Sequence, residues 1–250
     1  MRRRVVVAVA ALLVALAGPA QAITYGVPDG NAHPNVGALV FVDDDGLFAF
    51  CSGTLVSSRV LLTAAHCDPG GDPFGVTFDS EVSDDSPVRT GRFHADPRYN
   101  QRPSDPHDIA VVVFDQPVTG IQPAELPEAG LLERLDLRGQ RFTAVGYGAR
   151  ERVTGAGRPF FLEDPLRRRA ASSFRALTRS WLRLSQNPAT GDAGTCFGDS
   201  GGPNFLGGTS SNLVVAITIT GDAVCRATNV TYRLDATSAR AFLDDYVALP

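Results

Sequence analysis

The run Val214-Val215-Ala216-Ile217-Thr218-Ile219-Thr220 is the strongest strand signal in this chain of 250 residues. It is β-branched at every position except Ala216, and its second half alternates between Ile and Thr. β-Branched residues with a period of two favour an extended strand over a helix. The sequence therefore predicts a half-buried strand over 214–220, and the rest of the fold is read outward from it.

Shorter runs of the same kind recur along the chain. They cover residues 60–63, 109–114 and 142–145, and Gly, Pro, Asp or Ser bounds each of them. Turn signals separate them at Pro28-Asp29-Gly30, Asp45-Gly46, Pro69-Gly70-Gly71 and Gly207-Gly208. Many short strands with regular turns indicate an all-β sandwich or barrel.

Helical patterns are scarce. The clearest covers residues 236–247, where Asp235 could serve as the N-cap. The Arg-rich segment 167–183 shows neither a clear strand nor a clear helix, and its charges are most simply a solvated face. The composition, 44% hydrophobic and 20% charged, excludes a disordered chain, a coiled coil and a collagen-like repeat.

The first 22 residues have the layout of an export signal. Arg2, Arg3 and Arg4 precede an apolar stretch at 5–17, and Ala20-Gln21-Ala22 offers small residues for a signal peptidase. A retained N-terminal anchor is the alternative. Removal of three of the 23 basic residues makes the formal charge of −4 more negative by three, which disfavours nucleic-acid binding. We expect a secreted, extracellular protein.

Four cysteines remain in the exported part: Cys51, Cys67, Cys196 and Cys225. An even number in an exported chain favours disulfides, although spacing cannot choose among the three pairings. Short C-x-x-C spacings are absent, so zinc is not expected. The acidic clusters at 43–45 and 84–85 lack the ligand pattern of a calcium loop, and we expect no metal and no cofactor.

The stretch Gly198-Asp199-Ser200-Gly201-Gly202-Pro203 can hold a serine on a tight turn. Its glycines allow successive N–H groups to face one point beside the hydroxyl, as a nucleophile with an oxyanion hole requires. A serine needs a base and an orienting group. His66, next to Cys67, is the candidate base, and Asp108, at the mouth of an apolar strand, is the candidate orienting carboxylate.

The other histidines lie outside such patterns. His107 is the nearest competitor for the base because it adjoins Asp108, but its neighbours fit no motif. We expect His107, His33 and His94 to be surface residues in loops.

These residues resemble the chymotrypsin/trypsin family of secreted serine proteases, in a bacterial-looking version, over residues 23–250. His66, Asp108 and Ser200 occur in the order that the family uses. The matching stretches are Cys51-Ser52-Gly53-Thr54-Leu55, Thr63-Ala64-Ala65-His66-Cys67, Asp108-Ile109-Ala110 and residues 195–203.

The resemblance implies two packed six-stranded antiparallel β-barrels with a C-terminal helix, a boundary near 120–140 and an active site between the barrels. His66 would act as the base, Asp108 as the orienting carboxylate and Ser200 as the nucleophile. The N–H groups of Gly198 and Ser200 would form the oxyanion hole. The resemblance also implies the disulfides Cys51–Cys67 and Cys196–Cys225.

The family resemblance also bears on activation. Ile23 directly follows the expected signal cleavage site, and its new ammonium group would pair with a buried Asp199. We expect signal cleavage itself to create the activating amine.

The resemblance places the specificity pocket at Gly194, Thr195, Gly221 and Asn229. A pocket without a carboxylate favours an uncharged P1 side chain, the residue before the scissile bond, although Asp192 and Asp222 lie near enough in sequence to restore a basic preference. The Ser-Trp-Gly strand usual in the family is Ile219-Thr220-Gly221 here.

The sequence therefore predicts a serine endopeptidase, a monomer that acts on proteins or peptides, with a protein inhibitor as a candidate partner and no membrane contact after signal cleavage. The main alternative is a catalytically inactive homologue that acts as a binding protein. An esterase with the same residues is a second alternative. An α/β-hydrolase is disfavoured because no histidine follows Ser200.

Overall fold

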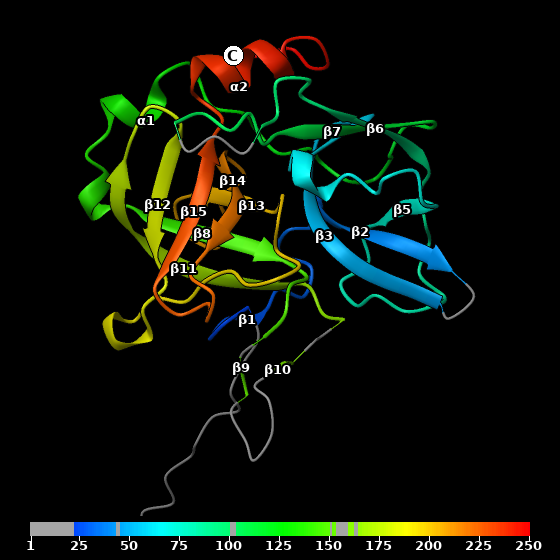
Figure 1. Ribbon diagram of the computed structural model, residues 1–250, viewed down its shortest axis with the longest axis horizontal. Coiled ribbons are helices and arrows are strands. Elements are labelled where there is room, and N and C mark those ends of the chain that lie inside the picture. Colours follow the sequence, from blue (N-terminus) through cyan, green and yellow to red (C-terminus); the bar gives the residue numbers. More distant parts are fainter. Residues whose placement is uncertain (1–22, 44–45, 101–103, 151, 154–159, 163–164) are drawn as a thin grey trace, which may run out of the picture.

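The computed structural model describes residues 23–43, 46–100, 104–150, 152–153, 160–162 and 165–250 (Figure 1). The expected export signal at 1–22 lies outside these residues. Within the described ranges, no helix has both the length and the apolar character needed to cross a membrane.

The first half of the chain forms an antiparallel sheet in the order β5-β2-β3-β4-β7-β6. Its two ends meet where Val76 of β5 and Arg89, just before β6, exchange backbone hydrogen bonds of 3.0 and 2.8 Å, so the sheet curves into a barrel. The strands are β2 (Val36–Asp43), β3 (Gly46–Ser57), β4 (Val60–Thr63), β5 (Phe74–Thr77), β6 (Gly91–Ala95) and β7 (Ala110–Phe114).

The second half forms a seven-stranded sheet in the order β1-β11-β12-β15-β14-β13-β8. Strands β11 and β8 also pair, which closes six of the strands into a ring and leaves β1 at the outside. The strands are β1 (Val27–Pro28), β8 (Arg141–Gly146), β11 (Arg168–Leu177), β12 (Trp181–Ser185), β13 (Pro203–Leu206), β14 (Val214–Gly221) and β15 (Thr228–Arg233).

The remaining elements are short. Strands β9 (Arg152–Val153) and β10 (Phe160–Phe161) pair with each other, and the helices are α1 (Leu131–Arg134), α2 (Thr237–Leu243) and the 3-10 turns η1 (Ala65–Cys67), η2 (Leu137–Gly139) and η3 (Pro188–Thr190). Figure 1 shows the two sheets side by side, with α2 near the C-terminus covering one end. The expected all-β fold with two barrels and a C-terminal helix is confirmed. Strand β7 ends at Phe114 and β8 begins at Arg141. The domain boundary at 120–140 stays a prediction.

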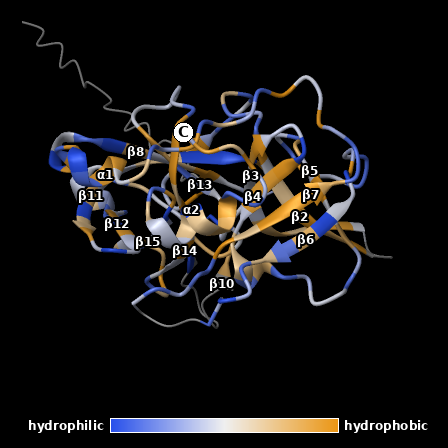
Figure 2. Ribbon diagram, turned by 90° about the horizontal axis from the view of Figure 1, so that it is seen from above, coloured by the Kyte–Doolittle hydropathy of each residue, from blue (hydrophilic) through white to orange (hydrophobic). Residues whose placement is uncertain are grey.

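The predicted strands are confirmed as β4, β7, β8 and β14. Their apolar side chains are almost fully buried, as in the four residues of β4. Figure 2 shows hydrophobic residues concentrated along the strands of the first sheet, whereas connecting loops are mostly hydrophilic. Burial of these alternating apolar faces is what holds the sheets in curved, closed form.

The predicted cap of the C-terminal helix is wrong. Helix α2 covers only 237–243, and Ala236 occupies the N-cap position without a side-chain hydrogen bond. The Asp235 carboxylate instead accepts hydrogen bonds from Arg233 Nε (2.9 Å) and from the N–H of Leu132 (2.8 Å). The charged partner outcompetes the helix terminus for this carboxylate.

The prediction that the Arg-rich segment 167–183 is a solvated face without clear strands is also wrong. Residues 168–177 and 181–185 are strands β11 and β12, and Arg167 is one of the largest fully buried side chains. Along β11, small residues such as Ala170 and Ser172 face inward and alternate with partly exposed ones. Because the inward-facing residues are small, their hydropathy differs little from that of the outward-facing residues. The alternation with a period of two that marks a strand is therefore not visible in the sequence.

Arg167 ties the two halves of the chain together. Its guanidinium donates to the carbonyls of Val36 (3.0 Å) and Phe78 (2.9 Å) and contacts the Asp29 carboxylate at 3.2 Å. Burial acts to raise the pKa of Asp29, but hydrogen bonds from His33 and the charge of Arg167 lower it to about 2. A buried carboxylate is thus stabilised by a buried cation at the junction of the sheets.

We expect Arg167→Met to lower the free energy of unfolding by about 3–5 kcal/mol, because it leaves the Asp29 charge buried with too few partners. For a chain of this size the melting temperature should fall by roughly 10 °C. Thermal denaturation on a Ser200→Ala background, which avoids self-digestion, measures this. Arg183→Met, which removes an exposed arginine of β12, is the matched control. Equal losses in both variants would contradict the role of Arg167.

Candidate active site

His66 and Asp108 are brought together by the pairing of β4 with β7. Thr63, at the end of β4, pairs with Ala110, so the turn η1 that carries His66 lies beside the residue preceding β7. His66 Nδ1 lies 2.8 Å from Asp108 Oδ2, and the His66 backbone N–H donates to Oδ1 at 3.0 Å. The carboxylate is 5% exposed and the imidazole 28%.

This arrangement fixes the histidine in one orientation. A carboxylate is an acceptor, so Nδ1 carries the proton and donates it to Asp108. The Nε2 lone pair then faces away from the carboxylate and is free to take a proton. Asp108, at the mouth of an apolar strand, obtains the partners that its burial requires.

Ser200 lies on the turn before β13, against the end of β4. The N–H of Ser52 donates to the Ser200 carbonyl at 2.8 Å, and Cys67 Sγ lies 3.7 Å from the same oxygen. Gly201 has a φ of +77°, and a Cβ there would come within 2.1 Å of Thr63 Oγ1. Only glycine therefore allows this turn to approach the segment that carries His66.

The predicted oxyanion groups lie on the same turn. Gly198 has a φ of +95°, and its carbonyl accepts a hydrogen bond from Ser52 Oγ at 2.9 Å. Among the residues that the structure describes, the N–H groups of Gly198 and Ser200 have no acceptor. Two unpaired N–H groups beside a serine hydroxyl can stabilise an oxyanion.

Asp199 is fully buried between these groups. Its carboxylate accepts from the N–H groups of Gly148 and Cys196, both at 2.8 Å. Burial nevertheless raises the pKa of Asp199 to about 7. No cationic side chain of the described ranges forms an ion pair with it.

Ile23 does not form an ion pair with Asp199 while residue 22 is attached, because its nitrogen then belongs to a peptide bond. Its side chain is fully buried and packs with Ala170 and Ala193, and its φ is +40°. The next residue, Thr24, accepts a hydrogen bond from the N–H of Gly194 at 3.1 Å. The segment that would become the N-terminus is thus already seated against the loop that leads to Ser200.

Two disulfides are present, Cys51–Cys67 and Cys196–Cys225, the two pairings that the resemblance implied. The first joins β3 to the residue after His66. In the described part of the chain, the one group of side chains close enough to hold a metal is Cys51, His66 and Cys67. Its two sulfurs are bonded to each other, so this group is not a metal site.

Three of the four predicted pocket residues, Gly194, Thr195 and Gly221, lie around a side chain that the sequence did not indicate. Gln186, which follows β12, is fully buried and accepts from the Thr195 N–H through Oε1 at 2.9 Å. A Cβ at Gly194 would meet that oxygen at 2.2 Å. No motif surrounds Gln186, because it reaches the pocket only through the folding of the second barrel.

Asn229 pairs with Gly221 across β14 and β15, and its side chain is fully buried. Its Nδ2 donates to Asn204 Oδ1 at 3.0 Å. Its own Oδ1 has no hydrogen-bond partner among the described atoms. An amide group, rather than a carboxylate, therefore stands at this position.

Both carboxylates that could give a basic preference are occupied elsewhere. Asp192 is buried and accepts from Arg141 and from Ser173, both at 2.7 Å. Burial acts to raise the pKa of Asp222, but backbone N–H groups, that of Thr228 foremost, hold it below its usual range. Asp192 thus has a cationic partner within the protein, and Asp222 is bound by backbone N–H groups of its own loop.

The expectation that the other histidines are loop residues at the surface is wrong for His33 and His94. His33 is buried, with Nδ1 2.6 Å from Asp29 Oδ1. His94 lies on β6, with its ring 5.7 Å from that of Tyr246.

His107 is only partly exposed, and its ring lies between Asp96 (3.3 Å) and Asp105 (4.0 Å). Both of its ring nitrogens thus face carboxylates. This leaves His66 as the histidine beside Asp108.

Comparisons with known proteins agree with this geometry. The family model described as Trypsin matches residues 28–240. Brachyurin of Leptuca pugilator is 31% identical over 231 residues, which cover 82% of this chain and 92% of that protein. Trypsin, alkaline C of Manduca sexta is 30% identical over 217 residues, 80% of this chain and 82% of that protein.

A trypsin of Saccharopolyspora erythraea is 26% identical over 212 residues, which cover 80% of this chain and 88% of that protein. The relatives are mainly proteases of arthropods and a snake, so the expectation that the chain looks bacterial is not borne out.

Proposed function

This chain belongs to the trypsin family of serine proteases, and on that premise we propose that it is a secreted serine endopeptidase acting through an acyl-enzyme on Ser200. The observation that carries the proposal is the buried Asp108 carboxylate, which holds His66 by both its ring and its backbone. The Ser200 carbonyl contacts Ser52 and Cys67, the residue after His66, so the glycine-rich turn lies against the segment that carries the oriented imidazole. A serine nucleophile requires a base held in this way. Cleavage of a mixed peptide library by the chain beginning at Ile23, compared with its Ser200→Ala variant, tests the proposal.

The proposed reaction proceeds in two halves. His66 Nε2 takes the proton of the Ser200 hydroxyl while Oγ attacks the scissile carbonyl, and the imidazolium then gives that proton to the leaving amine. Water, activated by the same nitrogen, hydrolyses the ester and regenerates the hydroxyl. Asp108 stays ionised and stabilises the imidazolium throughout.

The N–H groups of Gly198 and Ser200 would bind the oxyanion of each tetrahedral intermediate. Loss of one such donor typically costs about 10²- to 10³-fold in kcat. The Gly198 N–H shares its peptide group with the Phe197 carbonyl, which accepts from the Ala149 N–H at 2.7 Å, so the donor is oriented before substrate arrives. A preorganised donor needs no rearrangement when charge develops.

The alternative of an inactive homologue that binds partners is not favoured by any feature of the site. Such a protein would need none of the three groups that His66, Asp108 and Ser200 supply. An esterase would use the same groups, and cleavage of an unactivated peptide bond separates the two activities.

The proposal includes a preference for an uncharged P1 side chain. Gly194 and Thr195 bring no charge, Gln186 and Asn229 present amides, and both nearby carboxylates have partners within the protein. A buried amide gives no counter-charge for an Arg or Lys, whose desolvation would then go uncompensated.

In a library varied at P1, we expect the best uncharged residue to exceed Arg and Lys by at least about tenfold in kcat/KM, which corresponds to about 1.4 kcal/mol. The measurement is kcat/KM for peptides that differ only at that position. Asn229→Asp is the informative variant, because it replaces an amide by a carboxylate of equal size. It should raise the Arg rate relative to the uncharged rate. Preference of the unmodified protein for Arg would contradict the proposal.

Secretion, a monomeric state and susceptibility to a protein inhibitor are parts of the same proposal. N-terminal sequencing of exported protein tests the first, since a start at Ile23 is expected. Light scattering of the purified chain tests the second, and titration of its activity with a tight-binding proteinaceous protease inhibitor tests the third.

A further inference from the structure

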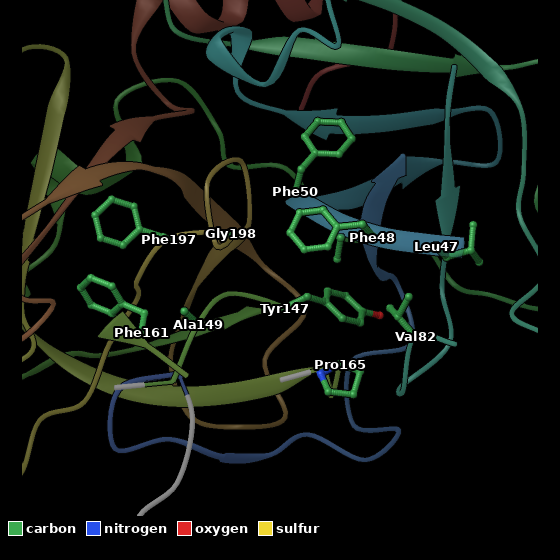
Figure 3. A pocket seen from close by; sticks show the side chains of 11 residues that line it. Leu47, Phe48, Phe50, Val82, Tyr147, Ala149, Phe161, Pro165, Phe197 and Gly198 are labelled. Atoms are coloured by element: carbon green, nitrogen blue, oxygen red, sulfur yellow. The ribbon is translucent and has the colours of Figure 1, made fainter. Parts of the chain in front are cut away.

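An apolar hollow of about 710 Å³ lies next to the candidate active site (Figure 3). One wall is β3 of the first sheet, with Leu47, Phe48 and Phe50. The opposite wall comes from the second half of the chain, with Tyr147, Phe161 and Phe197. None of the described residues that line it is charged.

The rings in this hollow are held open to solvent. Phe48 and Phe197 are 51% and 61% exposed, the two highest values among the large hydrophobic side chains of the described residues. Phe197 makes an edge contact with Phe161 (4.9 Å between centroids), and Phe50 stacks on Phe41 (4.1 Å). Exposed aromatic rings that are fixed in place around a hollow are typical of a binding surface.

Tyr147 contributes its ring to the hollow and not a polar group. Its hydroxyl donates to the Asp79 carbonyl at 2.6 Å and accepts from Arg167 at 3.2 Å. The hollow is thus apolar on the sides formed by Tyr147, Phe48 and Phe197, and a charged ligand would lose its hydration there without gaining a partner.

The position of the hollow relative to Ser200 decides what it binds. Gly198, whose N–H is a proposed oxyanion donor, borders it, and none of the four predicted P1 pocket residues does. Phe50 directly precedes Cys51, which is bonded to Cys67 beside His66. His66 protonates the leaving amine, so the leaving half of the substrate emerges on this side of Ser200.

We propose that the hollow binds the residues that follow the scissile bond and selects bulky apolar side chains there. This inference rests on the proposed protease function. A hollow of this volume exceeds one aromatic side chain, and in an extended substrate successive side chains point to opposite sides. The selection therefore acts within the first three positions after the scissile bond, P1′ to P3′.

The test uses peptides with one fixed P1 residue and with Phe, Leu, Gly or Asp at each of P1′ to P3′. We expect Phe or Leu to exceed Asp by at least tenfold in kcat/KM at one position or more. In Phe48→Arg the ratio of the Phe rate to the Asp rate at that position should fall at least fivefold, because a cation now faces the substrate. Phe48→Thr, which removes the ring but places a residue that favours strands in β3, should lower the ratio without reversing it.

Leu135→Arg is the matched control, because it places the same charge at an exposed apolar position outside the hollow. Its ratio should stay that of the unmodified protein. An ester of the same P1 residue with a small alcohol tests the proposed catalytic function separately from the selectivity of the hollow, because it carries no residues after the scissile bond. Ester hydrolysis with ratios below threefold at all three positions overturns the inference and leaves the protease function. Failure to cleave both the ester and the peptides overturns the protease function and the inference with it.

Discussion

Replacement of Ser200 by alanine is expected to reduce kcat/KM for peptide hydrolysis by about 10⁴- to 10⁶-fold. The variant lacks the atom that forms the acyl-enzyme, while His66 and Asp108 keep their hydrogen bonds. The measurement is the release of product from a peptide with the preferred P1 residue, at enzyme concentrations high enough to detect the residual rate. Asp108→Asn should cost about 10⁴-fold, because an amide can hold His66 in the wrong tautomer.

Two controls give this result its meaning. Ser210→Ala, at an exposed serine outside the site, should retain full activity. Ser200→Ala should still bind a peptide substrate, with a dissociation constant near the KM of the unmodified protein, since the rest of the site is intact. Retained hydrolysis in Ser200→Ala would contradict the assignment of the nucleophile. Absence of hydrolysis in the unmodified mature chain would favour the inactive binding protein.

The candidate catalytic residues could be predicted because each stands in a short, characteristic stretch. His66 follows a buried strand and adjoins a cysteine, Asp108 opens a buried strand, and Ser200 lies among glycines. In each case local constraints, such as the need for φ of +77° at Gly201, leave a mark on neighbouring residues. The strands around them were visible for a similar reason, because their apolar side chains are contiguous.

Structural features that depend on contacts between residues far apart in the sequence could not be predicted, because no local sequence pattern accompanies them. Gln186 meets Gly194 only through the closure of the second barrel, and Arg167 is buried because carbonyls of another sheet surround it. The apolar hollow joins Phe48 to Phe197, which are about 150 residues apart in the sequence. An isolated Phe or Arg in a sequence does not reveal which surface it will meet.

Extension of the mature chain by one residue before Ile23 is expected to lower kcat/KM by about 10²- to 10³-fold. The extension removes the ammonium group that would pair with the Asp199 carboxylate. An unpaired charge in this position costs about 3–5 kcal/mol, and Asp199 lies between Gly198 and Ser200, which carry the oxyanion donors. Initial rates of the extended and the unextended protein, prepared identically, measure the effect.

The backbone conformation of Ile23 also supports activation by cleavage before this residue. A φ of +40° is unfavourable for a β-branched residue and costs about 1–3 kcal/mol. This torsion angle exists only while residue 22 is attached, so cleavage of the Ala22–Ile23 bond releases the strain. Cleavage would therefore supply the cation and relax the backbone in one step.

The pKa of Asp199 gives this idea a second readout. Burial raises it from 3.8 to about 7 when no cation is present. A carboxyl group with a raised folded-state pKa binds a proton on folding, so its contribution to stability is complete below about pH 4 and is lost as the pH rises towards 7. The extended chain should lose on the order of 4 kcal/mol more than the mature chain over this range.

Urea denaturation between pH 4 and 8, on a Ser200→Ala background, measures that difference. Comparison of the extended and the mature chain cancels every other group that titrates in the same range. Asp199→Asn is the matched control, because an amide has no proton to lose and should make the two pH profiles parallel. Full activity with a residue before Ile23, or parallel profiles with Asp199 intact, would contradict activation by signal cleavage. If the pH dependence of stability differs between the extended and the mature chain only when Asp199 is present, the buried carboxylate interacts with the new N-terminus.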